Sequence, residues 1–190
     1  MWFANKQGKA FKIFTFYLMI MLIIQLLTTL LQTMSINNIY LSHFYFILQF
    51  LILSYFYFEI FQIDFHKKIV KIAVPVCITV LAIQYYFNPD LFYKFNYFEI
   101  FITSFLIIIF SMFHFYTILN EKKRYYYINI GIFAYLFGSA FLFISGNLMN
   151  SLNGSFGNIT WIINSILYIV YQVYIFIEFK GLYFDKKSKL

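Results

Sequence analysis

Five polar side chains, far apart in the sequence, are the residues of this chain best suited to hold a small molecule. They are His43, Glu99, Asn147, Trp161 and Asn164. A histidine beside a carboxylate can hold or transfer a proton near neutral pH, and two amides and an indole N–H add further hydrogen-bonding groups. If the fold brings these side chains together, they form a binding site for a small polar ligand or a lipid head group.

The composition indicates what kind of fold must position them. Of 190 residues, 63% are hydrophobic, 25% are aromatic and only 11% are charged, and the mean hydropathy is +0.77. A soluble domain typically carries about a quarter charged residues. The composition therefore predicts a membrane protein. It excludes a soluble enzyme, a disordered region and a nucleic-acid-binding domain, although the net charge is +7.

Six apolar segments are long enough to cross a bilayer, which takes about 20 residues per helix. In hydrocarbon only helices and closed barrels satisfy their backbone polar groups, and these segments lack the strict alternation of barrel strands. We therefore predict an all-α polytopic membrane protein, a bundle of six transmembrane helices with short loops that forms a single domain over residues 1–190. The predicted spans are residues 11–33, 42–62, 69–87, 97–119, 127–149 and 159–179.

The basic residues predict the orientation of this bundle. Thirteen of the 14 Lys and Arg residues fall on one side of the predicted topology, in the two terminal segments and in the second-to-third and fourth-to-fifth connections; Lys94 is the exception. Cytoplasmic loops carry such an excess, so both termini are expected to be cytoplasmic, in a bacterial inner membrane. The positive charge also attracts anionic lipids, and it needs no nucleic acid as a partner.

This topology places the five candidate residues at one depth. His43 opens the second span, Glu99 opens the fourth, Asn147 closes the fifth, and Trp161 and Asn164 open the sixth. All five are therefore expected in the outer half of the bundle, where they could form one ligand site. The alternative interpretation is that they are ordinary interfacial residues, because aromatic and polar side chains gather at both membrane surfaces.

Uncharged polar residues also form stripes along several predicted helices. The first helix carries Gln25 and Gln32 on one face, the second carries Gln49, and the sixth carries Tyr168 and Gln172. Such side chains either join helices through hydrogen bonds, worth about 0.6 kcal/mol each on average, or line a wet cavity. Both interpretations stay open at this point.

A second group of candidates is expected near the cytoplasmic interface. It consists of Glu59, His114 and Glu178. None of the carboxylates of the spans is expected at the bilayer midplane, which weakens the case for a proton relay. In the fifth span, Gly131 and Gly138 are seven residues apart and share a helix face, so they predict close contact with another helix.

The motifs that are missing also bear on function. The sequence has one cysteine, Cys77, and it lacks zinc-protease, serine-hydrolase and phosphate-loop motifs. We therefore predict no metal, cofactor or catalytic residues, and we favour a non-enzymatic binding, sensing or accessory subunit. Its partners would be the lipid bilayer and a membrane protein or a second copy of the chain. The alternatives are a small oligomeric channel or transporter, a membrane-perturbing effector, and a lipid-modifying enzyme that uses His43 and Glu99 as acid and base.

Several segments resemble an uncharacterised family of small six-span inner-membrane proteins typical of AT-rich Bacteroidota. The likeness lies in Phe44-Tyr-Phe-Ile-Leu-Gln-Phe, in the Asn-Tyr-Phe-Glu sequence that ends at Glu99, in Ser104 and Tyr116, and in Trp161-Ile-Ile-Asn164. The resemblance implies the six-span fold and no particular activity.

Overall fold

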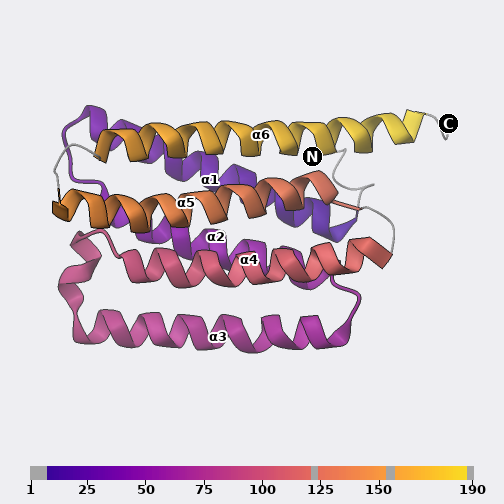
Figure 1. Ribbon diagram of the computed structural model, residues 1–190, viewed down its shortest axis with the longest axis horizontal. Helices are drawn as coiled ribbons and strands as arrows, with labels where there is room; N and C mark the ends of the chain where they lie inside the picture. Colours follow the sequence, from indigo (N-terminus) through magenta and orange to yellow (C-terminus); the bar gives the residue numbers. More distant parts are fainter. Residues whose placement is uncertain (1–7, 121–123, 153–156, 188–190) are drawn as a thin grey trace. The chain divides into compact units, whose positions relative to one another are not determined.

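A computed structural model describes residues 8–120, 124–152 and 157–187 of the chain. Each of the six α-helices in this part is long and apolar enough to cross a membrane, so the all-helical prediction is confirmed. The elements, in chain order, are α1 (Lys9–Thr33), α2 (Ile39–Ile60), α3 (Asp64–Phe87), the 3-10 helix η2 (Pro89–Tyr93), α4 (Tyr97–Asn120), α5 (Tyr126–Leu152) and α6 (Gly157–Lys187) (Figure 1).

The helix boundaries differ from the predicted spans mainly at the polar ends. Helix α3 begins at Asp64, five residues before the predicted start at residue 69, and its acidic first residue interacts favourably with the helix dipole. Helix α6 continues to Lys187, beyond the predicted end at residue 179. The 3-10 helix η2 was not predicted; it starts at Pro89, a residue whose fixed φ suits the first turn of a helix.

The chain divides into two compact units, Met1–Leu106 and Ile107–Leu190, with the boundary inside α4. In the first unit α1 packs against α2 and α2 against α3. The ring of Phe14 on α1 lies 5.3 Å from that of Phe56 on α2, and Nε2 of Gln49 donates to the hydroxyl of Tyr17 at 3.0 Å. The single domain predicted from the sequence stays a prediction.

In the second unit α5 and α6 pack closely, and the two glycines predicted for this role lie at the contact. A Cβ atom at Gly131 would come within 2.8 Å of Cδ2 of Tyr171, and one at Gly138 within 2.7 Å of Cδ1 of Leu167. The ring of Tyr171 in turn stacks on that of Tyr135, with centroids 5.4 Å apart. The predicted close approach of α5 to another helix is confirmed, because a side chain at either glycine would have to displace α6 atoms.

Helix α5 is also joined to α4 by a buried polar pair. Oγ of Ser111 donates to Oδ1 of Asn129 at 3.0 Å, and Nδ2 of Asn129 donates back to the backbone oxygen of Ser111 at 3.1 Å. Both residues are fully buried. Reciprocal bonding of this kind satisfies two polar groups that would be costly to leave alone in an apolar interior.

Candidate functional site

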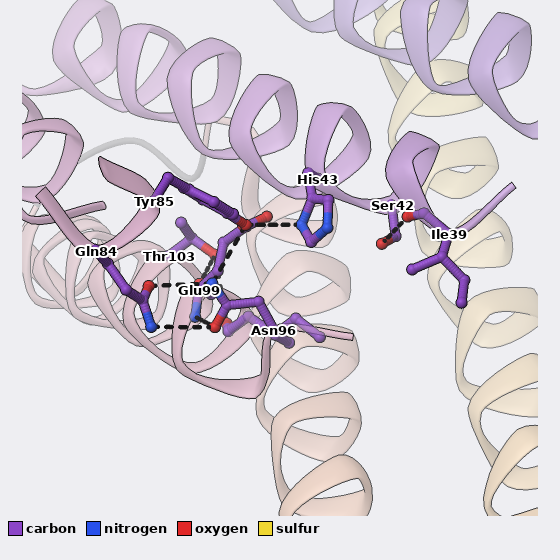
Figure 2. A network of polar contacts seen from close by, with 9 residues as sticks. Ile39, Ser42, His43, Gln84, Tyr85, Asn96, Glu99 and Thr103 are labelled. Atoms are coloured by element: carbon purple, nitrogen blue, oxygen red, sulfur yellow. Dashed lines mark hydrogen bonds and ion pairs between the residues drawn. The ribbon is translucent and has the colours of Figure 1, made fainter. Parts of the chain in front are cut away.

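A buried polar network lies in the first unit, where α2, α3 and α4 each contribute one end. His43 is in the second turn of α2 and Glu99 is in the first turn of α4. Nδ1 of His43 lies 3.0 Å from Oε2 of Glu99, and the two side chains are 4% and 0% exposed. Two of the five residues of the predicted outer site are therefore in direct contact (Figure 2).

Tyr85, near the end of α3, completes a triangle with these two residues. Its hydroxyl group donates to Oε2 of Glu99 and lies 2.8 Å from Nδ1 of His43. Nδ2 of Asn96 donates to the Tyr85 hydroxyl oxygen at 3.2 Å and to Oε1 of Gln84 at 3.0 Å. The tyrosine thus links the histidine and carboxylate to Asn96, which is in turn bonded to Gln84 on α3, and these contacts restrict the positions of all three helix ends.

Residues close in the sequence fix the backbone at Glu99. Asn96 immediately precedes α4, and its Oδ1 accepts a hydrogen bond from the backbone N–H of Glu99 at 3.2 Å. Asparagine is among the best N-cap residues because it satisfies one of the first helical N–H groups in this way. Oγ1 of Thr103 donates to the backbone oxygen of Glu99 at 2.7 Å. The carboxylate is therefore presented from a capped, well-defined helix start.

Two atoms of this network have no hydrogen-bond partner among the described residues. They are Nε2 of His43 and Oε1 of Glu99, and both are buried. A buried polar atom without a partner costs about 1–3 kcal/mol, and such atoms are rare in folded proteins. Figure 2 shows that Nε2 lies on the side of the imidazole turned away from Tyr85 and Glu99, so this nitrogen is not aimed at the network.

A pocket of about 390 Å³ adjoins the imidazole. Its lining consists of residues from α2, α3 and η2, namely His43, Phe44, Ile47, Tyr85, Pro89 and Phe92. The ring of Phe92 stacks on the His43 ring with centroids 5.5 Å apart and planes at 25°. The volume falls within the roughly 300–1,000 Å³ typical of small-ligand sites, and the walls are apolar apart from the histidine and tyrosine.

The other three residues of the predicted outer site belong to the second unit. Asn164 is half-buried on α6 in the second unit. The side chains of Asn147 and Trp161 lie outside the described residues, although both positions are helical. His43 and Glu99 are therefore the two members that the structure joins, and a shared site for all five stays a prediction.

Each residue of the predicted inner cluster has its own contacts. Oε1 of Glu59 lies 2.6 Å from Nζ of Lys9, which links the end of α2 to the start of α1. Nε2 of His114 lies 3.1 Å from the backbone oxygen of Arg124. Oε2 of Glu178 accepts from the backbone N–H of Tyr127 at 2.8 Å. These contacts hold helix ends together, and they favour structural roles over a ligand site.

The polar stripes are divided between exposed and packed positions. Gln25 and Gln32 are exposed on α1, whereas Gln49 is buried and bonded to Tyr17. On α6 the side chain of Tyr168 is hydrogen-bonded to that of Gln172 one turn later. Gln49 therefore joins two helices, which is the first of the two interpretations that the sequence left open.

Tyr85, Asn96 and Phe92 are the contributors that sequence reasoning missed. Asn96 carried a usable signal, because Asn followed three residues later by Glu is typical of a helix start. Tyr85 is one of many aromatic residues at the end of an apolar span, and nothing in its spacing distinguishes it. Among the described residues, no group of three His, Cys, Asp or Glu side chains could hold a metal ion.

Chemically, the site is a histidine oriented by a carboxylate. The Glu99 and Tyr85 contacts fix the ring through Nδ1, so that Nε2 is the nitrogen left for another molecule. Comparisons with known proteins add nothing to this geometry, since no protein-family model, curated protein or solved structure matches the chain.

Proposed function

We propose that this protein is a multi-pass protein of the bacterial inner membrane, with both termini in the cytoplasm, that binds a small molecule at His43 without transforming it. The six apolar helices support membrane insertion, and the distribution of basic residues supports the orientation. The resemblance to small six-span inner-membrane proteins agrees with both. The bound state would be communicated to a membrane-protein partner or to a second copy of the chain.

The observation that carries this proposal is the buried Nε2 of His43. The ring belongs to the wall of an apolar pocket, its other nitrogen is held by Glu99 and Tyr85, and Nε2 has no partner among the described residues. A ligand that placed one polar atom at Nε2 would remove this cost and would cover apolar lining at the same time.

Photo-crosslinking tests the proposal. Phe44, at the pocket rim, is replaced by the photoreactive residue benzoylphenylalanine, and Phe101, equally exposed but outside the pocket, serves as the matched control; the two side chains are 49% and 43% exposed. After irradiation in native membranes, we expect the Phe44 variant to carry a small-molecule adduct that the Phe101 variant lacks, as measured by intact mass. The same bulk-lipid adducts at both positions would contradict a ligand site.

A lipid-modifying enzyme is the second candidate, and one observation favours it. The 3.0 Å contact between Nδ1 of His43 and Oε2 of Glu99 is the arrangement in which a carboxylate orients a histidine that acts as a general base. Turnover of a bacterial lipid extract by the purified protein would support this candidate. It should be lost in Glu99→Gln and retained in Glu178→Gln, because Glu178 contacts only helix backbone among the partners described above.

A further inference from the structure

We propose that the ligand of the His43 pocket is an uncharged amphiphile whose polar group is a single hydroxyl, either an alcohol or a phenol. This inference rests on the proposed function and adds the chemical class of the ligand. The hydroxyl would bond to Nε2 of His43, and the apolar part would lie against Phe44, Ile47 and Phe92, which line the same pocket.

The hydrogen-bonding pattern of the network selects a hydroxyl. In one proton arrangement Nδ1–H of His43 and the Tyr85 hydroxyl both donate to Glu99, and Nε2 carries a lone pair. In the other, a protonated Glu99 donates to Tyr85, Tyr85 donates to Nδ1, and Nε2 carries the hydrogen. A hydroxyl group can donate to Nε2 in the first arrangement and accept from it in the second. A carbonyl or an ammonium group matches only one of them.

Charge balance argues against an ionised ligand. In the first proton arrangement the fully buried Glu99 supplies a carboxylate on the Nδ1 side of the imidazole. A ligand carboxylate at Nε2 would place a second negative charge near the first in an apolar interior, where like charges repel strongly. An ammonium group can only donate, so it fits Nε2 only when that nitrogen carries a lone pair. Its own charge would also be moved out of water into a mostly apolar pocket.

The size and lining of the pocket suit a short apolar group. A volume of about 390 Å³ holds about a dozen non-hydrogen atoms at the roughly 30 Å³ that a water molecule occupies in the liquid. Since Nε2 is itself buried, the hydroxyl reaches it when the Phe92 ring, which stacks on the imidazole, shifts aside. Phe92 belongs to the short helix η2, and its ring also contacts those of Tyr40 and Phe44 on α2, so its displacement exchanges these ring contacts for contacts with the ligand.

Nitrogen NMR of isotopically labelled histidine tests this class of ligand. The chain has three histidines, and substitution of His66 or His114 assigns the resonances. The protein in phosphatidylcholine nanodiscs is titrated with decanol, butylphenol, decanoate and decylamine. We expect decanol or butylphenol to shift the Nε2 resonance of His43 saturably. The two ionised probes should bind at least about tenfold more weakly, because each carries its charge into a mostly apolar pocket and matches only one proton arrangement of the network. Tighter binding of butylphenol would assign a phenol, and tighter binding of decanol an alcohol.

Two variants show whether binding occurs in the pocket. Ile47→Phe fills the pocket and should abolish the shift, while Phe101→Ala, outside the pocket, should leave it unchanged. Stronger binding of decanoate or decylamine would overturn the inference and leave the proposed function standing. A linear response that persists in Ile47→Phe would show only partition into the bilayer, which also overturns it. If in addition no adduct forms at Phe44 in the crosslinking experiment, the proposed function falls as well.

Discussion

Nδ1 of His43 lies 3.0 Å from Oε2 of Glu99, although 56 residues separate the two along the chain. The contact joins the second turn of α2 to the first turn of α4, and Tyr85 brings the end of α3 to the same point. One buried acceptor atom therefore stabilises the relative positions of three helices of the first unit.

Removal of that acceptor should destabilise the protein substantially. In Glu99→Leu both Tyr85 and His43 lose a buried partner, and we expect a loss of about 2–3 kcal/mol, the cost of leaving such groups unpaired. Glu99→Gln keeps an acceptor oxygen and should cost less than half as much. The control is Glu59→Leu, which breaks an ion pair whose lysine is 61% exposed and should cost under about 1 kcal/mol. The free energy of unfolding is measured by reversible unfolding in detergent. Equal losses of this free energy in Glu99→Leu and Glu59→Leu would contradict this role.

Glu178 should stabilise the start of α5. Its carboxylate accepts from the backbone N–H of Tyr127 at 2.8 Å and is also hydrogen-bonded to the backbone at Ile128. A carboxylate at a helix N-terminus satisfies unpaired N–H groups and interacts favourably with the helix dipole. We expect Glu178→Ala to lower the stability by about 1–2 kcal/mol and to accelerate hydrogen exchange at Tyr127. Unchanged exchange there, with Glu59→Ala as the control, would rule this role out.

The two glycines of α5 should differ in their tolerance of a methyl group. In Gly131→Ala the new Cβ meets the Tyr171 ring at 2.8 Å and Cβ of Tyr174 at 3.1 Å, neither of which can move without displacing a packed ring or α6 itself. We expect a loss of about 1–3 kcal/mol, as for other overpacked sites. Gly138→Ala meets only the flexible end of Leu167 and should cost less.

Gly181→Ala is the matched control for these two substitutions. It lies on α6 with no atom within 4 Å of the added Cβ, so it should be neutral or slightly stabilising because alanine favours helix more than glycine does. The midpoint of thermal unfolding in detergent gives the order of stability of the three variants. A Gly131→Ala variant as stable as Gly181→Ala would show that α5 and α6 are not in close contact there.

Ser111 and Asn129 should be energetically coupled. Their reciprocal hydrogen bonds are buried, so the double variant Ser111→Ala/Asn129→Leu should be less destabilised than the sum of the single variants. Interhelical hydrogen bonds in membrane proteins give coupling energies of about 0.6 kcal/mol on average and at most about 1.7. A double-mutant cycle by unfolding measures this difference, and strict additivity would exclude the coupling.

The six helices could be predicted because composition and length leave few alternatives in hydrocarbon. The predicted start of the fourth span at residue 97 coincides with the start of α4. The start of α3 at Asp64 was missed because a polar first turn at an interface looks like a loop in a hydropathy pattern. The short helix η2 is below the length at which periodicity is informative.

The candidate site was predictable only in part. Depth, which follows from position in a span, put His43 and Glu99 in one group with three other residues, and these two are in contact. Which helices are neighbours depends on side-chain fit, which a single sequence does not display. For that reason Tyr85 was not recognised, and the grouping of Asn164 with the His43 site is still a prediction.

Cysteine labelling tests most directly the central claim of a polar site on the outer side of a six-span membrane protein. The native thiol, Cys77, is 1% exposed and should not react. Tyr93→Cys lies in η2 beside the pocket, and Lys68→Cys lies near the start of α3; both positions are exposed. We predict that a membrane-impermeant maleimide labels Tyr93→Cys in intact spheroplasts and labels Lys68→Cys only after permeabilisation. The reverse pattern, or labelling of both variants in intact spheroplasts, would contradict the account.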